Sequence, residues 1–244
     1  MNNTFDFKRF GQVVTQDWRN YFRNFGIALI VWCSLPVLFW IASLVLDLDI
    51  VNGSRFVFIG IFVFTASMVV PSKVYGKANL SREGVRFAML PATSIEKFFS
   101  MVLYCSIITP LFVGLGSWAV DSLLALLPFG GFVDYVAFPK EKLGMLLVTI
   151  ACMVLLVSSI FMFGNMVFKK RKTGKTIAWG MLIIFVLAMI LQLFQFWDAF
   201  DMWVVETSSR LNQRFLPWLY SAIQMVIAIV FYILTYHKIK TQKY

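Results

Sequence analysis

Residues 143–168 read LGMLLVTIACMVLLVSSIFMFGNMVF, a run without a charged side chain, and residues 169–175 continue as KKRKTGK. A helix needs about 20 mostly apolar residues to cross the roughly 30 Å hydrocarbon core of a membrane. The run is long enough to do so, and the cations that follow it indicate where the helix leaves the membrane. This change from apolar to basic sequence decides the fold class.

Similar apolar runs recur along the chain. They predict six membrane-spanning helices at about residues 24–46, 56–75, 98–120, 143–168, 176–197 and 215–236. The second reaches residue 75 only if the Lys73 side chain extends to the lipid headgroups. Each run is continuous, whereas the strands of a membrane barrel would be short and alternating. We therefore expect an all-α integral membrane protein whose single domain covers residues 1–244.

The composition favours a membrane protein over a soluble one. Hydrophobic residues make up 60% of the chain and charged residues 14%, against about 45–50% and about 25% in soluble domains. The same hydrophobic excess excludes an intrinsically disordered chain. Because the net charge of +10 comes from cations in the loops, no nucleic-acid partner is expected.

The distribution of charge sets the expected topology. If six spans alternate, the side that holds the N-terminus receives 17 of the 22 Lys and Arg residues and four of the 12 Asp and Glu residues. The positive-inside rule then places both termini in the cytoplasm. The expected location is a bacterial cytoplasmic, or inner, membrane.

Residues 1–23 predict an additional amphipathic helix. Aromatic and apolar residues recur there and just beyond at helical spacing, namely Phe7, Phe10, Val14, Trp18, Tyr21, Phe22 and Phe25. A basic helix with an aromatic face favours a position in the membrane interface, leading into the first span. The alternative is a helix packed on a protein partner.

The predicted spans lack the residues that would carry catalysis or ion coupling. The three cysteines have no metal-ligand spacing and His237 is the sole histidine, so neither a metal site nor a histidine-based triad is expected. No Asp, Glu or His lies inside a span, which disfavours an ion-coupled transporter. The nucleotide-binding pattern GxxxxGK[ST] is also missing from the sequence. The chain is therefore not expected to be an enzyme by itself or to hold a cofactor.

Uncharged polar and small residues remain within the apolar runs. The polar ones are Asn165, Gln192, Gln195 and Gln224. Such amides either form hydrogen bonds between helices or line a translocation path. Gly114 and Gly116 predict a close approach between helices for a related reason, since small residues let helix backbones come together.

The loop at residues 73–97 carries the most specific pattern. Residues 78–90 can form a short helix that mixes charged and apolar side chains, and Pro91 then ends it. Residues 93–96, TSIE, fit the capping box [ST]-x-x-E, so a new helix is expected to begin there and to continue into the third span. A short surface helix before a break is typical of a docking element, and a plain connector fits the pattern equally well.

Residues 86–97, RFAMLPATSIEK, resemble the LP-x-S/T-x-x-E-K segment of permease subunits of type-2 ABC exporters. That family shares a similar length, six spans and an amphipathic N-terminal helix. The resemblance implies a subunit that forms a homodimer or heterodimer and pairs with a separate cytoplasmic ABC ATPase, which binds ATP and magnesium. It also implies that residues 78–90 are a coupling helix, seated in a groove of that ATPase.

The resemblance gives a role to individual residues of the loop. The coupling residues that it implies are Arg82, Glu83, Arg86, Phe87, Met89, Leu90, Pro91, Glu96 and Lys97. The first three would make polar docking contacts, the next three would fill the groove, and Glu96 would cap the third span.

The sequence thus predicts the membrane-spanning subunit of an ATP-driven exporter that works by alternating access. Its uncharged, aromatic-rich spans favour a lipidic or amphipathic substrate. A non-transporting membrane accessory or immunity protein would share the topology. An enzyme acting on lipids would need the outer-side carboxylates, which are Asp121, Asp134, Asp198, Asp201 and Glu206. Two longer segments on that side, residues 122–139 and 198–214, resemble the outer caps of such exporters.

Overall fold

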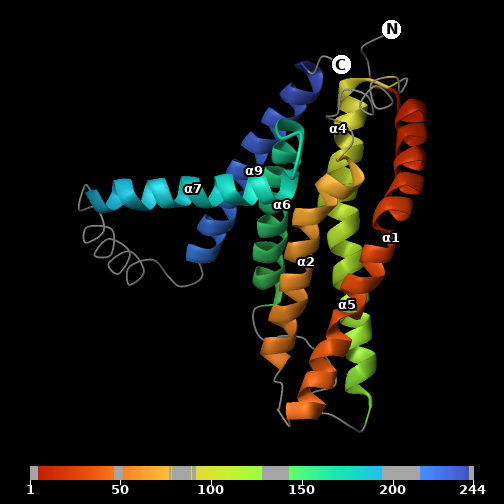
Figure 1. Ribbon diagram of the computed structural model, residues 1–244, viewed down its shortest axis with the longest axis vertical. Helices are drawn as coiled ribbons and strands as arrows, with labels where there is room; N and C mark the ends of the chain where they lie inside the picture. Colours follow the sequence, from red (N-terminus) through yellow and green to blue (C-terminus); the bar gives the residue numbers. More distant parts are fainter. Residues whose placement is uncertain are drawn as a thin grey trace.

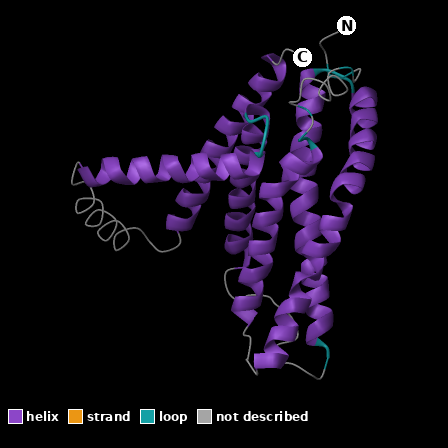
Figure 2. Cartoon of the chain, in the orientation of Figure 1, coloured by secondary structure: helices purple, strands orange, loops and turns teal. Residues whose placement is uncertain are grey.

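The computed structural model describes residues 5–46, 52–76, 92–127, 143–193 and 215–241, together with positions 78 and 89 (Figure 1). Every regular element within these ranges is a helix, as Figure 2 shows by colour. Five of the helical segments are long and apolar enough to cross a membrane. The fold is therefore an all-α bundle of membrane-type helices, as predicted.

The first helix, α1 (Phe7–Leu46), is continuous and joins the predicted N-terminal helix to the first predicted span. Its buried face repeats every four residues through Val13, Asp17, Tyr21 and Phe25. The predicted N-terminal helix is thus continuous with the first predicted span, and its position in the membrane interface stays a prediction. No proline interrupts the chain before Pro36, and burial of Tyr21 and Phe25 against the bundle stabilises a continuous helix through the junction.

The third predicted span is longer than expected and contains a π-helix. It consists of α4 (Ser94–Val102), the π-helical η1 (Leu103–Ile108) and α5 (Thr109–Ala125). Pro110 has no N–H to donate to the carbonyl of Ser106, which favours a wider turn at this point. The backbone N–H of Thr109 donates instead to the carbonyl of Tyr104, and the Thr109 hydroxyl donates to the same oxygen at 2.7 Å. The segment runs parallel to α1 and packs along it, with contacts from Asp17 with Ser100 through Tyr21 with Thr109 to Trp32 with Ser117 (Figure 1).

The other helices overlap the remaining predicted spans. They are α2 (Asn52–Val74), α6 (Leu143–Val167), α7 (Lys172–Leu193) and α9 (Phe215–Thr241). The five membrane-type segments do not include α7. In Figure 1 this helix points sideways out of the bundle, so six spans are not confirmed. Its contacts with α2 and α6 involve residues of its first turns, such as Lys172, Thr173 and Thr176. Packing at one end of a helix does not align it with its neighbours.

The core lies where α1, α2, α4 and α6 meet. Its fully buried large side chains include Tyr21, Phe25, Met101, Tyr104, Met162 and Met166. We call the end of the bundle where α1 and α4 begin and α9 ends the basic end, because α1 carries Lys8 and Arg9 there and α9 carries Lys238 and Lys240 (Figure 1). The start of the first helix and the end of the last helix thus lie at the same end of the bundle. The assignment of this basic end to the cytoplasm stays a prediction.

Candidate functional site

The loop that resembles a coupling segment leaves the bundle at the basic end, after α2, and returns at α4. Most of its predicted docking residues lie outside the described residues, namely Arg82, Glu83, Arg86, Phe87, Leu90 and Pro91. Ala78 is buried, and Met89 is 77% exposed. The structure therefore describes how the two ends of the loop are anchored, and we call these contacts the loop anchor.

The returning end of the loop is fixed by the predicted capping box. Thr93 is the N-cap of α4, and its hydroxyl accepts a bond from the backbone N–H of Glu96 at 3.4 Å. The Glu96 carboxylate in turn accepts from the backbone N–H of Thr93 at 2.8 Å. The prediction that Glu96 caps the third span is confirmed. Thr93, and not Ser94, is the capping residue.

Glu96 also ties the start of α1 to the loop anchor. Its side chain is fully buried, its Oε1 accepts from the backbone N–H of Asp6 at 2.9 Å, and Arg9 Nη2 lies 3.3 Å from the same oxygen. The neighbouring Lys97 is buried as well. Both residues belong to the interior of the bundle. Glu96 therefore holds the end of the loop through buried contacts and is not a residue of the loop surface.

Asp17 links α1 to both ends of the loop. Its Oδ2 atom accepts a hydrogen bond of 2.6 Å from the Ser100 hydroxyl on α4 and one of 2.9 Å from the Tyr75 hydroxyl, just after α2. The side chain is buried, and bonds to a charged acceptor are stronger than bonds between neutral groups. One carboxylate thereby fixes three helices relative to one another.

The departing end of the loop is held by the connection between α6 and α7. Asn165 Nδ2 donates to the carbonyl of Tyr75 at 3.2 Å, and Lys172 Nζ donates to the carbonyl of Gly76 at 2.5 Å. A cation satisfies the free carbonyls at a helix C-terminus well. Burial lowers the pKa of Lys172 to about 8. Position 76 requires glycine, because a Cβ there would overlap the carbonyl oxygen of Ser72.

Two of the four amides predicted to line a path, Asn165 and Gln224, have described side chains. Asn165 belongs to the loop anchor, while Gln224 is buried in α9 and its Oε1 has no hydrogen-bond partner among the described residues. Gln192 lies in α7 without a described side chain, and Gln195 lies outside the described residues. The translocation path through these four amides therefore stays a prediction.

A cluster of hydroxyl groups at the π-helix was missed by the sequence analysis. The Ser106 hydroxyl lies 2.8 Å from that of Ser158 on α6 and 2.7 Å from that of Tyr232 on α9. Such groups satisfy one another within an apolar bundle. A serine in an apolar run gives no signal of its partners, so only the packing of three helices reveals the cluster.

The opposite end of the bundle contains a buried ion pair. Arg55 on α2 donates to both carboxylate oxygens of Asp121 on α5, at 3.2 and 2.6 Å, and both residues are 3% exposed. Asp121 therefore has a structural partner in Arg55. The other outer carboxylates, Asp134, Asp198, Asp201 and Glu206, lie outside the described residues. Within the described part of the chain, no three potential metal ligands come together.

Comparison of the chain with models of protein families found no match, and neither did searches of curated proteins and of solved structures.

Proposed function

We propose that this chain is the membrane-spanning subunit of an ATP-driven exporter, powered by a separate ATPase that acts on the loop at residues 73–97. The ATP and magnesium would be bound by that ATPase. Two copies of this chain, or this chain and a related one, would form the pathway. The substrate class that the uncharged spans favour is lipidic or amphipathic.

The observation that carries the proposal is the loop anchor. The loop begins at Tyr75 and Gly76, whose carbonyls are held from α6 and α7. It ends at Thr93, which is bonded to Glu96 within the cap, and the Glu96 carboxylate is held from the start of α1. Asp17 joins the two ends. A displacement of the loop would be passed to five helices through these polar contacts, which form the kind of contiguous network that can carry coupling.

The chemistry of the chain supports an external source of energy. The sequence has no phosphate-binding loop of the GxxxxGK[ST] type and no carboxylate or histidine inside a predicted span. An ion-coupled transporter needs such groups to bind its coupling ion. A subunit that takes its energy from a partner ATPase does not need ion-binding groups within its spans.

The proposal is tested by asking whether ATPase activity accompanies the protein. The tagged full chain is purified in mild detergent from the membranes of the organism that encodes it, and MgATP hydrolysis is measured per mole of chain. Arg86→Glu reverses a charge in the predicted coupling helix, while Arg171→Glu makes the same change in the other basic loop and is the control. We expect hydrolysis to fall about tenfold or more with Arg86→Glu alone, because a reversed charge in a docked interface costs several kcal/mol.

Two results would contradict the proposal. Equal hydrolysis by the Arg86→Glu and Arg171→Glu proteins would show that the loop is not the coupling element. Absence of hydrolysis from every preparation would favour a non-transporting accessory or immunity protein, which needs no ATPase.

A further inference from the structure

An apolar groove opens on the side of the bundle between α4 and α9. It has a volume of about 330 Å³ and is lined by Ile95, Phe98 and Phe99 from α4 and by Ile229, Tyr232, Ile233 and Tyr236 from α9. Phe99 and Ile233 are at least half exposed, so the groove is open to the surroundings of the helices. Its apolar lining suits a hydrocarbon chain better than a polar ligand.

Aromatic rings continue from the groove to the start of α1. The ring centroids of Phe98 and Tyr236 are 5.8 Å apart, and those of Phe99 and Phe5 are 6.3 Å apart. The Phe5 ring also lies next to those of Phe7 and Phe10, with centroids 5.1 and 5.5 Å away. Tyrosine is enriched at the level of the lipid headgroups, and Tyr236 is followed by the basic residues Lys238 and Lys240 in the last turn of α9. The groove therefore extends toward the end of the bundle where the headgroup of a lipid would lie.

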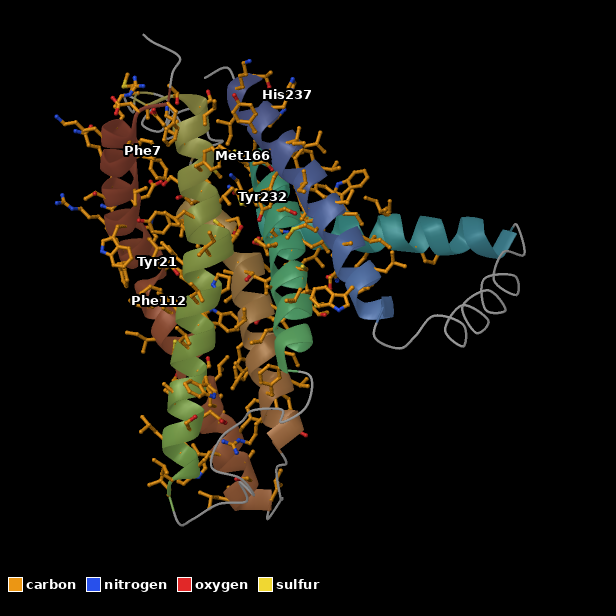
Figure 3. The ribbon with its side chains drawn as sticks, turned by 180° about the vertical axis from the view of Figure 1, so that it is seen from behind. Phe7, Tyr21, Phe112, Met166, Tyr232 and His237 are labelled. Carbon is orange, nitrogen blue, oxygen red and sulfur yellow. The ribbon has the colours of Figure 1, made fainter. Side chains whose placement is uncertain are left out.

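The charge at the end of the groove is positive. Ile229, Ile233, Tyr236 and Lys240 follow one another on α9 at spacings of four, three and four, which places them on one face of the helix. Lys240 is exposed and extends this face one turn beyond the groove, toward the basic end. In Figure 3, His237 lies nearer than Tyr232 to the basic end of α9. No acidic residue occurs in α9.

We propose that the groove between α4 and α9 binds an anionic phospholipid. One acyl chain lies along Phe98, Phe99 and Ile233, and the phosphate pairs with Lys240. Charge complementarity selects this occupant, because the net negative charge of an anionic headgroup attracts a cation at the end of the groove more strongly than a zwitterionic headgroup, whose own cation offsets its phosphate. The inference concerns a bound lipid and does not depend on the proposed exporter function.

The experiment uses the full chain in detergent with equal amounts of phosphatidylglycerol and phosphatidylcholine that carry the same acyl chains. Native mass spectrometry measures the fraction of protein that retains one lipid of each kind. Ile233→Trp places a bulky ring in the groove. Ile227→Trp is the matched control, since residue 227 lies near the opposite face of α9 and its side chain is also exposed.

A second pair of variants tests the headgroup. Lys240→Gln removes the cation on the groove face, and Lys238→Gln makes the same change on the opposite face of the same helix turn. A cation near an anionic lipid surface contributes enough for about a fivefold change in preference. We expect Lys240→Gln to lower the ratio of retained phosphatidylglycerol to phosphatidylcholine by about that factor, with Lys238→Gln close to the unmodified protein.

The expected result is a preference for phosphatidylglycerol that Ile233→Trp removes and Ile227→Trp leaves in place. Equal retention of the two lipids by the unmodified protein would overturn the proposal. So would equal loss in the two tryptophan variants, or an equal loss of preference in the two glutamine variants. Both substituted pairs are exposed on α9, so the variants keep the buried contacts of the bundle.

Discussion

The two ends of the bundle are held by different kinds of polar contact. At the basic end, the Asp17 carboxylate is shared between hydroxyl donors on Tyr75 and Ser100. At the other end, Arg55 and Asp121 form one ion pair with two hydrogen bonds. Tyr75 and Arg55 are roughly 30 Å apart along α2 at 1.5 Å per residue. This separation equals about one thickness of the hydrocarbon core.

The two kinds of contact would break in different ways if the helices moved apart. Removing one partner of a buried ion pair leaves an uncompensated charge, so the contact between Arg55 and Asp121 is either complete or very costly to break. A carboxylate with several hydroxyl donors loses its bonds one at a time, at about 1.5–3 kcal/mol each. The end next to the loop is therefore the one whose contacts can change in steps.

The largest expected effect follows from breaking the ion pair. Asp121→Leu leaves Arg55 buried without its carboxylate and should lower the free energy of unfolding by about 3–5 kcal/mol. The double variant Arg55→Met with Asp121→Leu should recover most of that loss, because no charge remains buried. Unfolding by SDS titration in detergent micelles measures both. A double variant as unstable as the single one would contradict the assignment of the pair.

Asp17→Asn tests the stepwise contact at the basic end. The amide keeps the shape of the side chain and removes the charge, so we expect a loss of about 2 kcal/mol, less than for Asp121→Leu. Tyr75→Phe should cost a similar amount, and combining the two substitutions should cost less than their sum because they share one hydrogen bond. The same SDS titration applies, and strict additivity would show that Tyr75 and Asp17 do not interact.

Gly116→Ala tests the packing between the two ends. A Cβ at position 116 would lie 2.5 Å from Cys33 Sγ on α1, and crowding of this kind costs about 1–3 kcal/mol. Cys33→Ala removes the obstructing sulfur and should restore most of the stability. Gly60→Ala is the control, since nothing lies within 4 Å of a Cβ there. Helix propensity alone would favour alanine at both positions, so an equal loss with Gly60→Ala would show that the close approach of α1 and α5 does not set the result.

Thr93→Ala should have the smallest effect. The substitution removes one acceptor at the start of α4 and should cost about 1 kcal/mol, because Arg9 and the backbone of Asp6 still hold Glu96. Ser94→Ala, one residue further on, is the control and should be nearly neutral. The difference is measured by the same unfolding titration, and a larger loss with Ser94→Ala would mean that the cap is misassigned.

Local sequence patterns predicted the features that depend on neighbouring residues. The long apolar runs gave the helices α2, α6 and α9 nearly to their ends, and the spacing of Thr93 and Glu96 gave the capping box. Gly116 was predicted to allow a close approach, and it does so toward Cys33. Each of these features depends on residues within one helical turn or one apolar run, so composition and periodicity are enough to predict it.

Contacts between distant segments were not predicted. Arg55 and Asp121 are 66 positions apart, and Asp17 and Ser100 are 83 apart, so no local spacing connects them. Asp17 did leave one signal, because it stands at four-residue intervals with Val13 and Tyr21 on the face that is buried. An acid on such a face indicates a partner inside the protein.

The sequence by itself determined that this protein is a bundle of apolar helices, because a chain with such long uncharged runs can satisfy its backbone in a membrane only as helices. It also determined where α4 begins. Only the tertiary structure decided that α1 is one continuous helix, that Asp17 and Glu96 anchor the two ends of the loop, and that α7 departs from the bundle. These outcomes depend on which helix faces meet, and packing between distant segments settles that.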